Sequence, residues 1–220
     1  GLEAITALVS SIPGEIGMAF LIVQHLSPEH SSILGDIIAK KTDLLVSEAT
    51  DGEEIRPNHA YVIPPNTTMT VNNGKLALKR RDNRMQPPMP VDDLFFSLAD
   101  EYGSDAIGVI LSGSGSDGAL GMQAIKGEGG ITLVQDDMSA RFNGMPQATV
   151  DMGNADFILP PEEIAEQLIH IAKHPSLQTE PMQLEVERMS ADEKGLSKIF
   201  HLLNEAFDID FKHYKRGTVT

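Results

Sequence analysis

The sequence predicts an α/β fold with a doubly wound, mostly parallel sheet, an antiparallel hairpin excursion and a three-layer αβα arrangement. Short continuous apolar runs, typical of strands buried on both faces, alternate with segments whose apolar residues recur at helical spacing. Such alternation builds a parallel sheet with helices on both faces. One stretch departs from this alternation and supplies the hairpin.

The helices follow from apolar periodicity and from the residues at their ends. The first helix stops at Pro13, and the last has Pro161 with glutamates beside it near its first turn. The predicted helices cover 2–12, 32–42, 91–103, 118–130, 145–153 and 161–174. The strands predicted between them cover 18–24, 44–49, 106–112, 131–136 and 156–160.

The middle of the chain has a different residue pattern. Residues 59–65 and 68–79 are short and β-like, and Asn73-Gly74 is a strong turn signal for a hairpin. A loop rich in breaker residues follows at 80–90. We therefore expect an antiparallel excursion from an otherwise parallel sheet.

The composition restricts the class of protein. The 220 residues suffice for one sizeable α/β core, with or without a short appendage. A net charge of −15 argues against general nucleic-acid binding and against docking to anionic lipid. The absence of cysteine excludes disulfides and thiol nucleophiles and is compatible with a cytoplasmic location. No apolar run reaches the roughly 20 residues that a membrane span needs.

Two polar loops stand where strands of the predicted sheet end, which is where sites form in such folds. They are "HLSPEH" at 25–30 and "SGSGSDG" at 112–118. The second loop is compatible with a phosphate cradle, a nucleophile loop or a turn that presents the carboxylate of Asp117. Neither a P-loop lysine nor a His-Glu-x-x-His metal motif is present, so we predict no metal site and no cofactor. A Gly-x-Gly-x-x-Gly spacing occurs in the loop, but its position in the chain makes a nucleotide role a weak alternative.

Acyl-transfer chemistry requires a nucleophile, a base and a group that orients the base. His25 could serve as the base and Asp117 could hold its imidazole. The simpler alternatives are that His25 is a capping or core residue and that Asp117 is the N-cap of the helix at 118–130. The serines in the two loops do not stand in a typical nucleophile elbow.

Residues 1–173 resemble the catalytic domain of the chemoreceptor protein-glutamate methylesterase (CheB-type) family. Four segments carry the resemblance in order: "VQHLSPEHSS", "DGEEIRPNHAYVIPPN", the stretch from "VDDLFFSLADEYG" through "SGSGSDGALGM" to "ITLVQD", and "SARFNGMPQATVDMGNADFILPPEEIAEQL". The resemblance implies a doubly wound fold and a Ser-His-Asp triad that hydrolyses glutamate methyl esters and deamidates glutamines on chemoreceptors.

The resemblance also assigns roles to residues. Gln24-His25 matches the motif of the family histidine, and the 112–118 loop puts the family aspartate at Asp117. The backbone N–H of Ser114, between Gly113 and Gly115, would then belong to the oxyanion hole. Met145 and Pro146 would shape a substrate wall, although a buried turn before a helix explains them equally well.

One member of the triad has no counterpart in the chain. The family serine stands in a Gly-Ala-Ser-x-Gly-Gly motif before the first helix, and Gly1 matches the last glycine of that motif. The resemblance implies that the nucleophile and the first strand of the sheet lie upstream of residue 1. These 220 residues alone would then have negligible esterase activity. The alternative is a non-catalytic regulatory or docking module of a signalling hybrid.

The tail suggests a second unit. Residues 174–190 are polar and proline-bearing, which predicts a linker, and 191–220 begin as an amphipathic helix. This end resembles the start of a CheR-type chemoreceptor methyltransferase through Asp210, Phe211, Tyr214, Lys215 and Thr218. The expected partners are a methylated chemoreceptor and a fused methyltransferase domain, without nucleic acid or membrane insertion.

Overall fold

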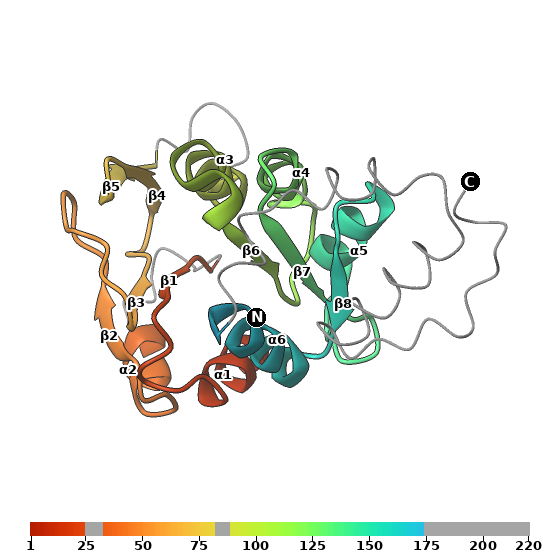
Figure 1. Cartoon of the computed structure of the whole chain (residues 1–220), viewed down its shortest axis with the longest axis horizontal. Helices are drawn as coiled ribbons and strands as arrows, with labels where there is room; N and C mark the ends of the chain where they lie inside the picture. Colours follow the sequence, from red (N-terminus) through yellow and green to blue (C-terminus); the bar gives the residue numbers. More distant parts are fainter. Residues whose placement is uncertain (25–32, 82–88, 174–220) are drawn as a thin grey trace, which may run out of the picture. The chain divides into compact units, whose positions relative to one another are not determined.

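The parallel strands form two three-stranded sheets in the computed structural model (Figure 1). The structure describes residues 1–24, 33–81 and 89–173, within a compact unit that spans Gly1–Thr179. His25 and the tail, for which a linker and a methyltransferase-like start were predicted, lie outside the described residues.

Each sheet is wholly parallel and has a simple strand order. The first contains β1 (Ala19–Ile22), β2 (Leu45–Glu48) and β3 (His59–Val62) in the order β1-β3-β2. The second contains β6 (Ile107–Ile110), β7 (Ile131–Gln135) and β8 (Phe157–Leu159) in the order β6-β7-β8. Apart from β3, these strands lie where the apolar runs predicted them.

The helices also match the periodic segments. They are α1 (Leu2–Ser10), α2 (Ile33–Ala39), α3 (Pro90–Tyr102), α4 (Ala119–Gly127), α5 (Gly144–Asp151) and α6 (Pro161–Lys173), with a 3₁₀ turn at Gly103–Asp105. Proline at the start of α3 and of α6 has no N–H to leave unpaired, and acidic residues follow it in both first turns.

The antiparallel hairpin covers fewer residues than the sequence pattern predicted. It consists of β4 (Thr67–Asn72) and β5 (Lys75–Arg80), joined at Asn73-Gly74 with φ of 52° and 69°, as the turn signal predicted. Residues 59–62, which also differed from the other strands, are instead the middle strand of the first sheet. Tyr61 and Ala60 are fully buried there, because neighbouring strands lie on both sides and core on both faces.

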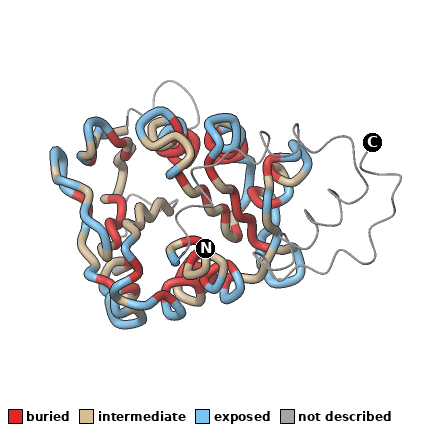
Figure 2. The backbone as a smooth tube through the Cα atoms, in the orientation of Figure 1, coloured by how far each residue is buried: buried red, intermediate tan, exposed pale blue. Residues whose placement is uncertain are grey.

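Buried residues lie along the strands and on the helices beside them (Figure 2), and they form two separate apolar cores. Along β3, Ala60 and Val62 pack in the core that contains α1, α2 and α6, while Tyr61 packs in the core that contains α3 and α4. Along β7, Leu133 and Val134 divide between the same two cores. Both sheets therefore share one pair of helical layers, and the fold class is confirmed as α/β with a layer of strands between two layers of helices.

Candidate functional site

The carboxyl ends of β1 and β6 converge beside the start of α1. A Cβ atom placed on Gly1 would lie 3.1 Å from Nε2 of Gln24, which follows β1, and 3.9 Å from the carbonyl oxygen of Ser112, which follows β6. The carbonyl of Gly1 in turn accepts the amide of Ile5 within the first turn of α1 (3.0 Å). Three segments far apart in the sequence thus meet at one point on the edge of the strand layer.

The loop after β6 is held in place from both sides. The amide of Ser112 donates to Oε1 of Gln135 (2.7 Å), and Oγ of Ser112 accepts the amide of Phe142 (3.0 Å). The amide of Gly113 donates to the carbonyl of Phe142 (2.9 Å), and Gly113 accepts the amide of Met145 (3.0 Å). Ser112 is therefore buried and engaged, whereas Ser114 and Gly115 lie exposed beyond the braced part.

Gly113 lies close to α5. A Cβ on Gly113 would meet the side chain of Met145, so a larger residue there would displace that side chain. The close approach lets the backbone of the loop form the hydrogen bonds to Phe142 and Met145. Neither Gln135 nor Phe142 was identified as a site residue from the sequence, since their role depends on contacts across the fold.

Asp117 is buried, with 4% of its surface exposed, and its carboxylate caps a helix. Oδ2 accepts the amide of Val91 (3.1 Å) and Oδ1 accepts the amide of Asp92 (3.0 Å), both in the first turn of α3. The capping alternative is therefore correct in kind but named the wrong helix. Asp117 caps α3 across the fold, whereas the N-cap position of α4, the helix that follows it, is Gly118, which has no side chain to form a cap.

Asp92 makes the reciprocal contact. Its Oδ1 accepts the amide of Gly121 in the first turn of α4 (2.7 Å). A carboxylate of α3 thus binds the start of α4, while the carboxylate of Asp117, just before α4, binds the start of α3. Burial raises the pKa of Asp92, the charge of Asp117 raises it further, and the N–H of Gly121 opposes the shift. This exchange fixes the position of Asp117 against two helices.

Arg81 is the nearby cation. It donates Nε–H to the carbonyl of Thr67 (2.8 Å) at the end of the hairpin. Burial lowers the pKa of Arg81, while the negative charges of Asp117 and Asp93 act in the opposite direction. Arg81 therefore offsets part of the negative charge that Asp117 brings into the interior.

The remaining predicted site residues have different outcomes. His25 is outside the described residues, so its contact with Asp117 stays a prediction, although Gln24 directly before it lies at this edge. Met145 and Pro146 are buried at the start of α5, with Met145 against Gly113. Shortly before them in the sequence, the large apolar side chains of Met138 and Phe142 are exposed, and the guanidinium carbon of Arg141 lies 5.7 Å from the ring centre of Phe142.

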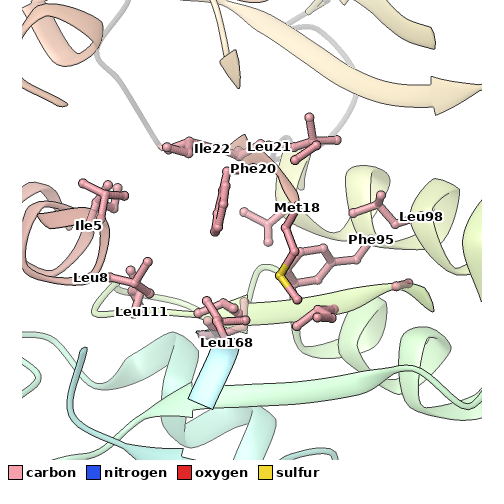
Figure 3. A pocket seen from close by; sticks show the side chains of 18 of the residues that line it. Ile5, Leu8, Met18, Phe20, Leu21, Ile22, Phe95, Leu98, Leu111 and Leu168 are labelled. Atoms are coloured by element: carbon pink, nitrogen blue, oxygen red, sulfur yellow. The ribbon is translucent and has the colours of Figure 1, made fainter. Parts of the chain in front are cut away.

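A cavity of about 950 Å³ leads away from the site between β1 and β6. Gly1, Gln24 and Ser112–Ser114 line one part of it, and the rest is mainly apolar (Figure 3). Oε1 of Gln24 is buried and has no hydrogen-bond donor within the described part of the chain.

Within residues 1–24, 33–81 and 89–173, no group of three or more His, Asp or Glu side chains is arranged to hold a metal ion. No helix in those same ranges is long and apolar enough to cross a membrane.

The chain resembles known proteins over most of its length. Residues 1–168 match the family profile described as CheB methylesterase. The chain belongs to the CheB methylesterase family. The crystal structure of the Thermotoga maritima CheB methylesterase catalytic domain superposes with a TM-score of 0.71 and 30% identity, over 78% of this chain and 93% of that one.

Relatives with assigned names agree. A protein-glutamate methylesterase/protein-glutamine glutaminase of Desulfotalea psychrophila is 34% identical over 79% of this chain and 49% of its own length. Its Escherichia coli K12 counterpart is 35% identical over 77% and 49%. A putative protein of the same name from Leptospira interrogans is 32% identical over 78% of this chain and 89% of its own. The chain spans about half the length of the first two of these CheB relatives.

Gly118 tests how tightly the Asp117 turn is packed. It has a φ of 94°, and an added Cβ would lie 2.5 Å from Cδ1 of Ile110 and 2.7 Å from Cγ1 of Val91. Gly118→Ala should lower the free energy of unfolding by about 2–5 kcal/mol, from left-handed backbone strain plus overpacking. Gly115→Ala is the matched control, since φ is 87° but nothing lies within 4 Å of its Cβ, and should cost only about 1–2 kcal/mol. Equal losses in urea unfolding would contradict the packing around Gly118.

Asp92 should leave a signature in the pH dependence of stability. Because its pKa is raised above the ordinary 3.8, its contribution is complete below that value and is lost as the pH rises through the folded-state pKa. Asp92→Asn removes this titration. The free energy of unfolding of the Asp92→Asn variant should therefore fall less than that of the unsubstituted chain as the pH rises above about 4. Asp100→Asn, at an exposed position of the same helix, is the control. Parallel curves for the unsubstituted chain and Asp92→Asn would show that Asp92 titrates normally.

Proposed function

We propose that the protein to which this chain belongs is a protein-glutamate methylesterase and protein-glutamine deamidase of methyl-accepting chemotaxis receptors. Family membership and the names of the relatives support the activity. The observation that carries the proposal is the meeting, at one edge, of Gln24, the loop after β6 that bears Asp117, and Gly1. The cytoplasmic location and the receptor substrate belong to the same proposal.

The mechanism uses a Ser-His-Asp triad. His25 removes the proton of the serine hydroxyl as the oxygen attacks the γ-carbonyl carbon of a receptor glutamate methyl ester. The protonated imidazole then returns that proton to the departing methoxide, which leaves as methanol. Water, deprotonated by His25, cleaves the glutamyl-serine ester to give glutamate and the regenerated serine. With glutamine as substrate, ammonia leaves in place of methanol.

Asp117 would hold the imidazole of His25 in the productive tautomer and stabilise its charged form. Its anchoring by the amides of Val91 and Asp92 supports this role, because a carboxylate that orients a base has to be fixed itself. The macrodipole of α3 also favours negative charge at this position.

The backbone N–H of Ser114 would stabilise the oxyanion of the tetrahedral intermediate. A preorganised donor of this kind is worth about 3 kcal/mol in the transition state. Ser114 lies exposed, directly beyond the segment that Phe142 and Met145 brace, which suits a donor that has to face substrate without moving.

We place the nucleophilic serine on a strand that precedes Gly1. The hydroxyl of Ser112 accepts the amide of Phe142 and is buried, which disfavours it as the nucleophile. Gly1 stands beside Gln24, whose buried Oε1 has no donor in the described part of the chain. A segment that arrives at Gly1 would deliver its last side chains to this point.

The second candidate is a non-catalytic docking module of a hybrid with a CheR-type methyltransferase. It is favoured if the segment before Gly1 contains no serine. The hybrid itself is supported only by the sequence of residues 210–218, which lie outside the described structure.

The proposal is tested by methanol release from a receptor peptide that carries a glutamate methyl ester. The 220 residues should show negligible turnover, and the chain extended upstream through the strand and serine should be active. In the extended chain, Asp117→Asn should reduce kcat by about 10³–10⁴-fold, whereas Asp93→Asn should have little effect.

The outcomes separate the hypotheses. Substantial, equal turnover by both chains would refute the upstream nucleophile. An inactive but folded extended chain would favour the docking module. Unfolding midpoints measured for each variant exclude loss of structure as the cause of a low rate.

A further inference from the structure

The turn of the hairpin is attached to helix α3 by one carboxylate. β4 and β5 are joined at Asn73-Gly74, and β4 runs beside α3 (Figure 1). Oε2 of Glu101, near the end of α3, accepts the amide of Asn73 (3.1 Å), and Oε1 accepts the amide of Gly74 (2.8 Å). A single side chain of the helix therefore binds both N–H groups of the turn.

This attachment lies at the surface of the protein. Asn73 and Glu101 are both exposed, so water has access to the turn and to the carboxylate. Hydrogen bonds at such positions open locally at a low cost in free energy, because water replaces the lost partner. The two amides of the turn therefore become free from time to time without unfolding of the rest of the chain.

An asparagine followed by glycine can react with its own backbone. The amide nitrogen of Gly74 loses its proton and bonds to Cγ of Asn73, while the bond from Cγ to Nδ2 breaks and ammonia leaves. The product is a five-membered succinimide ring. Water then cleaves one of the two C–N bonds of the ring and leaves aspartate or isoaspartate at position 73. Glycine favours this attack because it has no Cβ to obstruct the approach.

The folded turn opposes the reaction in two ways. The N–H of Gly74 is donated to Glu101, and the negative charge of that carboxylate disfavours removal of the proton. The side-chain amide of Asn73 is also engaged, since Nδ2 donates to Oδ1 of Asn72 (2.7 Å). The attack requires rotation of the backbone at Asn73, which has a φ of 52°, and Glu101 has to release both amides before that rotation.

The chain has a second Asn-Gly step, Asn143-Gly144, which is held by different contacts. A Cβ on Gly144 would lie 2.9 Å from the amide nitrogen of Gly115, so backbone packs on backbone there. Nδ2 of Asn143 donates to Oδ1 of Asp137 (2.6 Å), and the carbonyl of Asn143 accepts the amide of Gln147 (2.8 Å). Rotation at Asn143 would disturb the start of α5. This step is therefore an internal reference with the same chemistry and no contact with Glu101.

Conversion of Asn73 would change its contact with α3. A carboxylate replaces a neutral amide on the residue whose own N–H binds Glu101, and like charges at such short range repel each other. Isoaspartate also adds a methylene group to the backbone, so the two amides of the turn no longer have the spacing of the two oxygens of Glu101.

We propose that Asn73 is a site of self-modification by deamidation, that Glu101 controls its rate, and that the aspartate or isoaspartate product releases the hairpin turn from α3. The modification needs water alone and occurs on the surface of the hairpin. It is independent of the esterase proposal.

The test follows both Asn-Gly steps of the folded 220-residue chain in mildly alkaline buffer, with peptide mass spectrometry to separate asparagine, aspartate and isoaspartate. Glu101→Ala should speed the conversion of Asn73 by about threefold or more, because the hydrogen bonds that hold the turn are lost. Glu101→Gln retains one acceptor and should have a smaller effect. Asp100→Ala, at the exposed neighbouring position of α3, is the matched control and should leave the rate unchanged. Asn143 should convert at the same rate in every variant.

The effect of the product is tested separately with Asn73→Asp. Hydrogen exchange at the amides of residues 73 and 74, corrected for the intrinsic rates of each sequence, should become about threefold faster or more. The amide of Val71, which donates to Oγ of Ser97 (3.0 Å), should change little. Asn73→Gly permits the left-handed turn without adding a charge, so it should retain the protection of both amides.

Three results would contradict the proposal. Equal rates at Asn73 in the unsubstituted chain and in Glu101→Ala would show that Glu101 does not control the reaction. Conversion of Asn73 in urea but in neither folded chain would show that the geometry of the turn alone prevents it. Unchanged exchange in Asn73→Asp would refute release of the turn. No turnover is measured in these experiments, so the esterase proposal can fail or survive separately.

Discussion

Every strand inside a parallel sheet needs a partner on each side, and β1 and β6 have one on a single side in the described structure. The apolar residues of β1 are half-buried, and a large, mainly apolar cavity lies between β1 and β6. Both strands and the cavity reach the candidate site beside Gly1.

The site depends on contacts between elements as much as on its loops. Asp117 caps α3 and Asp92 binds the first turn of α4, so the two helices and the turn after β6 are mutually positioned. Gln135 and Phe142 brace Ser112 from the other side. A displacement of α3 relative to α4 would move Asp117 together with the end of the loop that bears Ser114. The same contacts therefore stabilise the fold and set the geometry of the proposed triad.

Local sequence patterns predicted much of this architecture. The Pro13 stop, the apolar run before Ser112 and the Asn73-Gly74 turn each report on a few neighbouring residues, and each is found as expected. The position of a strand within the sheet was harder to predict from the sequence. His59–Val62 is a middle strand because β1 and β2 pair with it on either side, and its own residues do not indicate those partners. The capping alternative for Asp117 named the helix that follows it, yet its carboxylate caps α3, which begins more than 20 residues earlier. The pairing of His25 with Asp117, which strand ends suggested and the resemblance to CheB-type enzymes supports, stays a prediction because His25 lies outside the described residues.

The most direct test of this account is an experimental structure of the chain extended upstream through the proposed strand and serine. We expect a serine hydroxyl within hydrogen-bond distance of the His25 ring, and the second ring nitrogen on Asp117. A structure with that serine away from the His25 ring, or with the ring turned away from Asp117, would refute it.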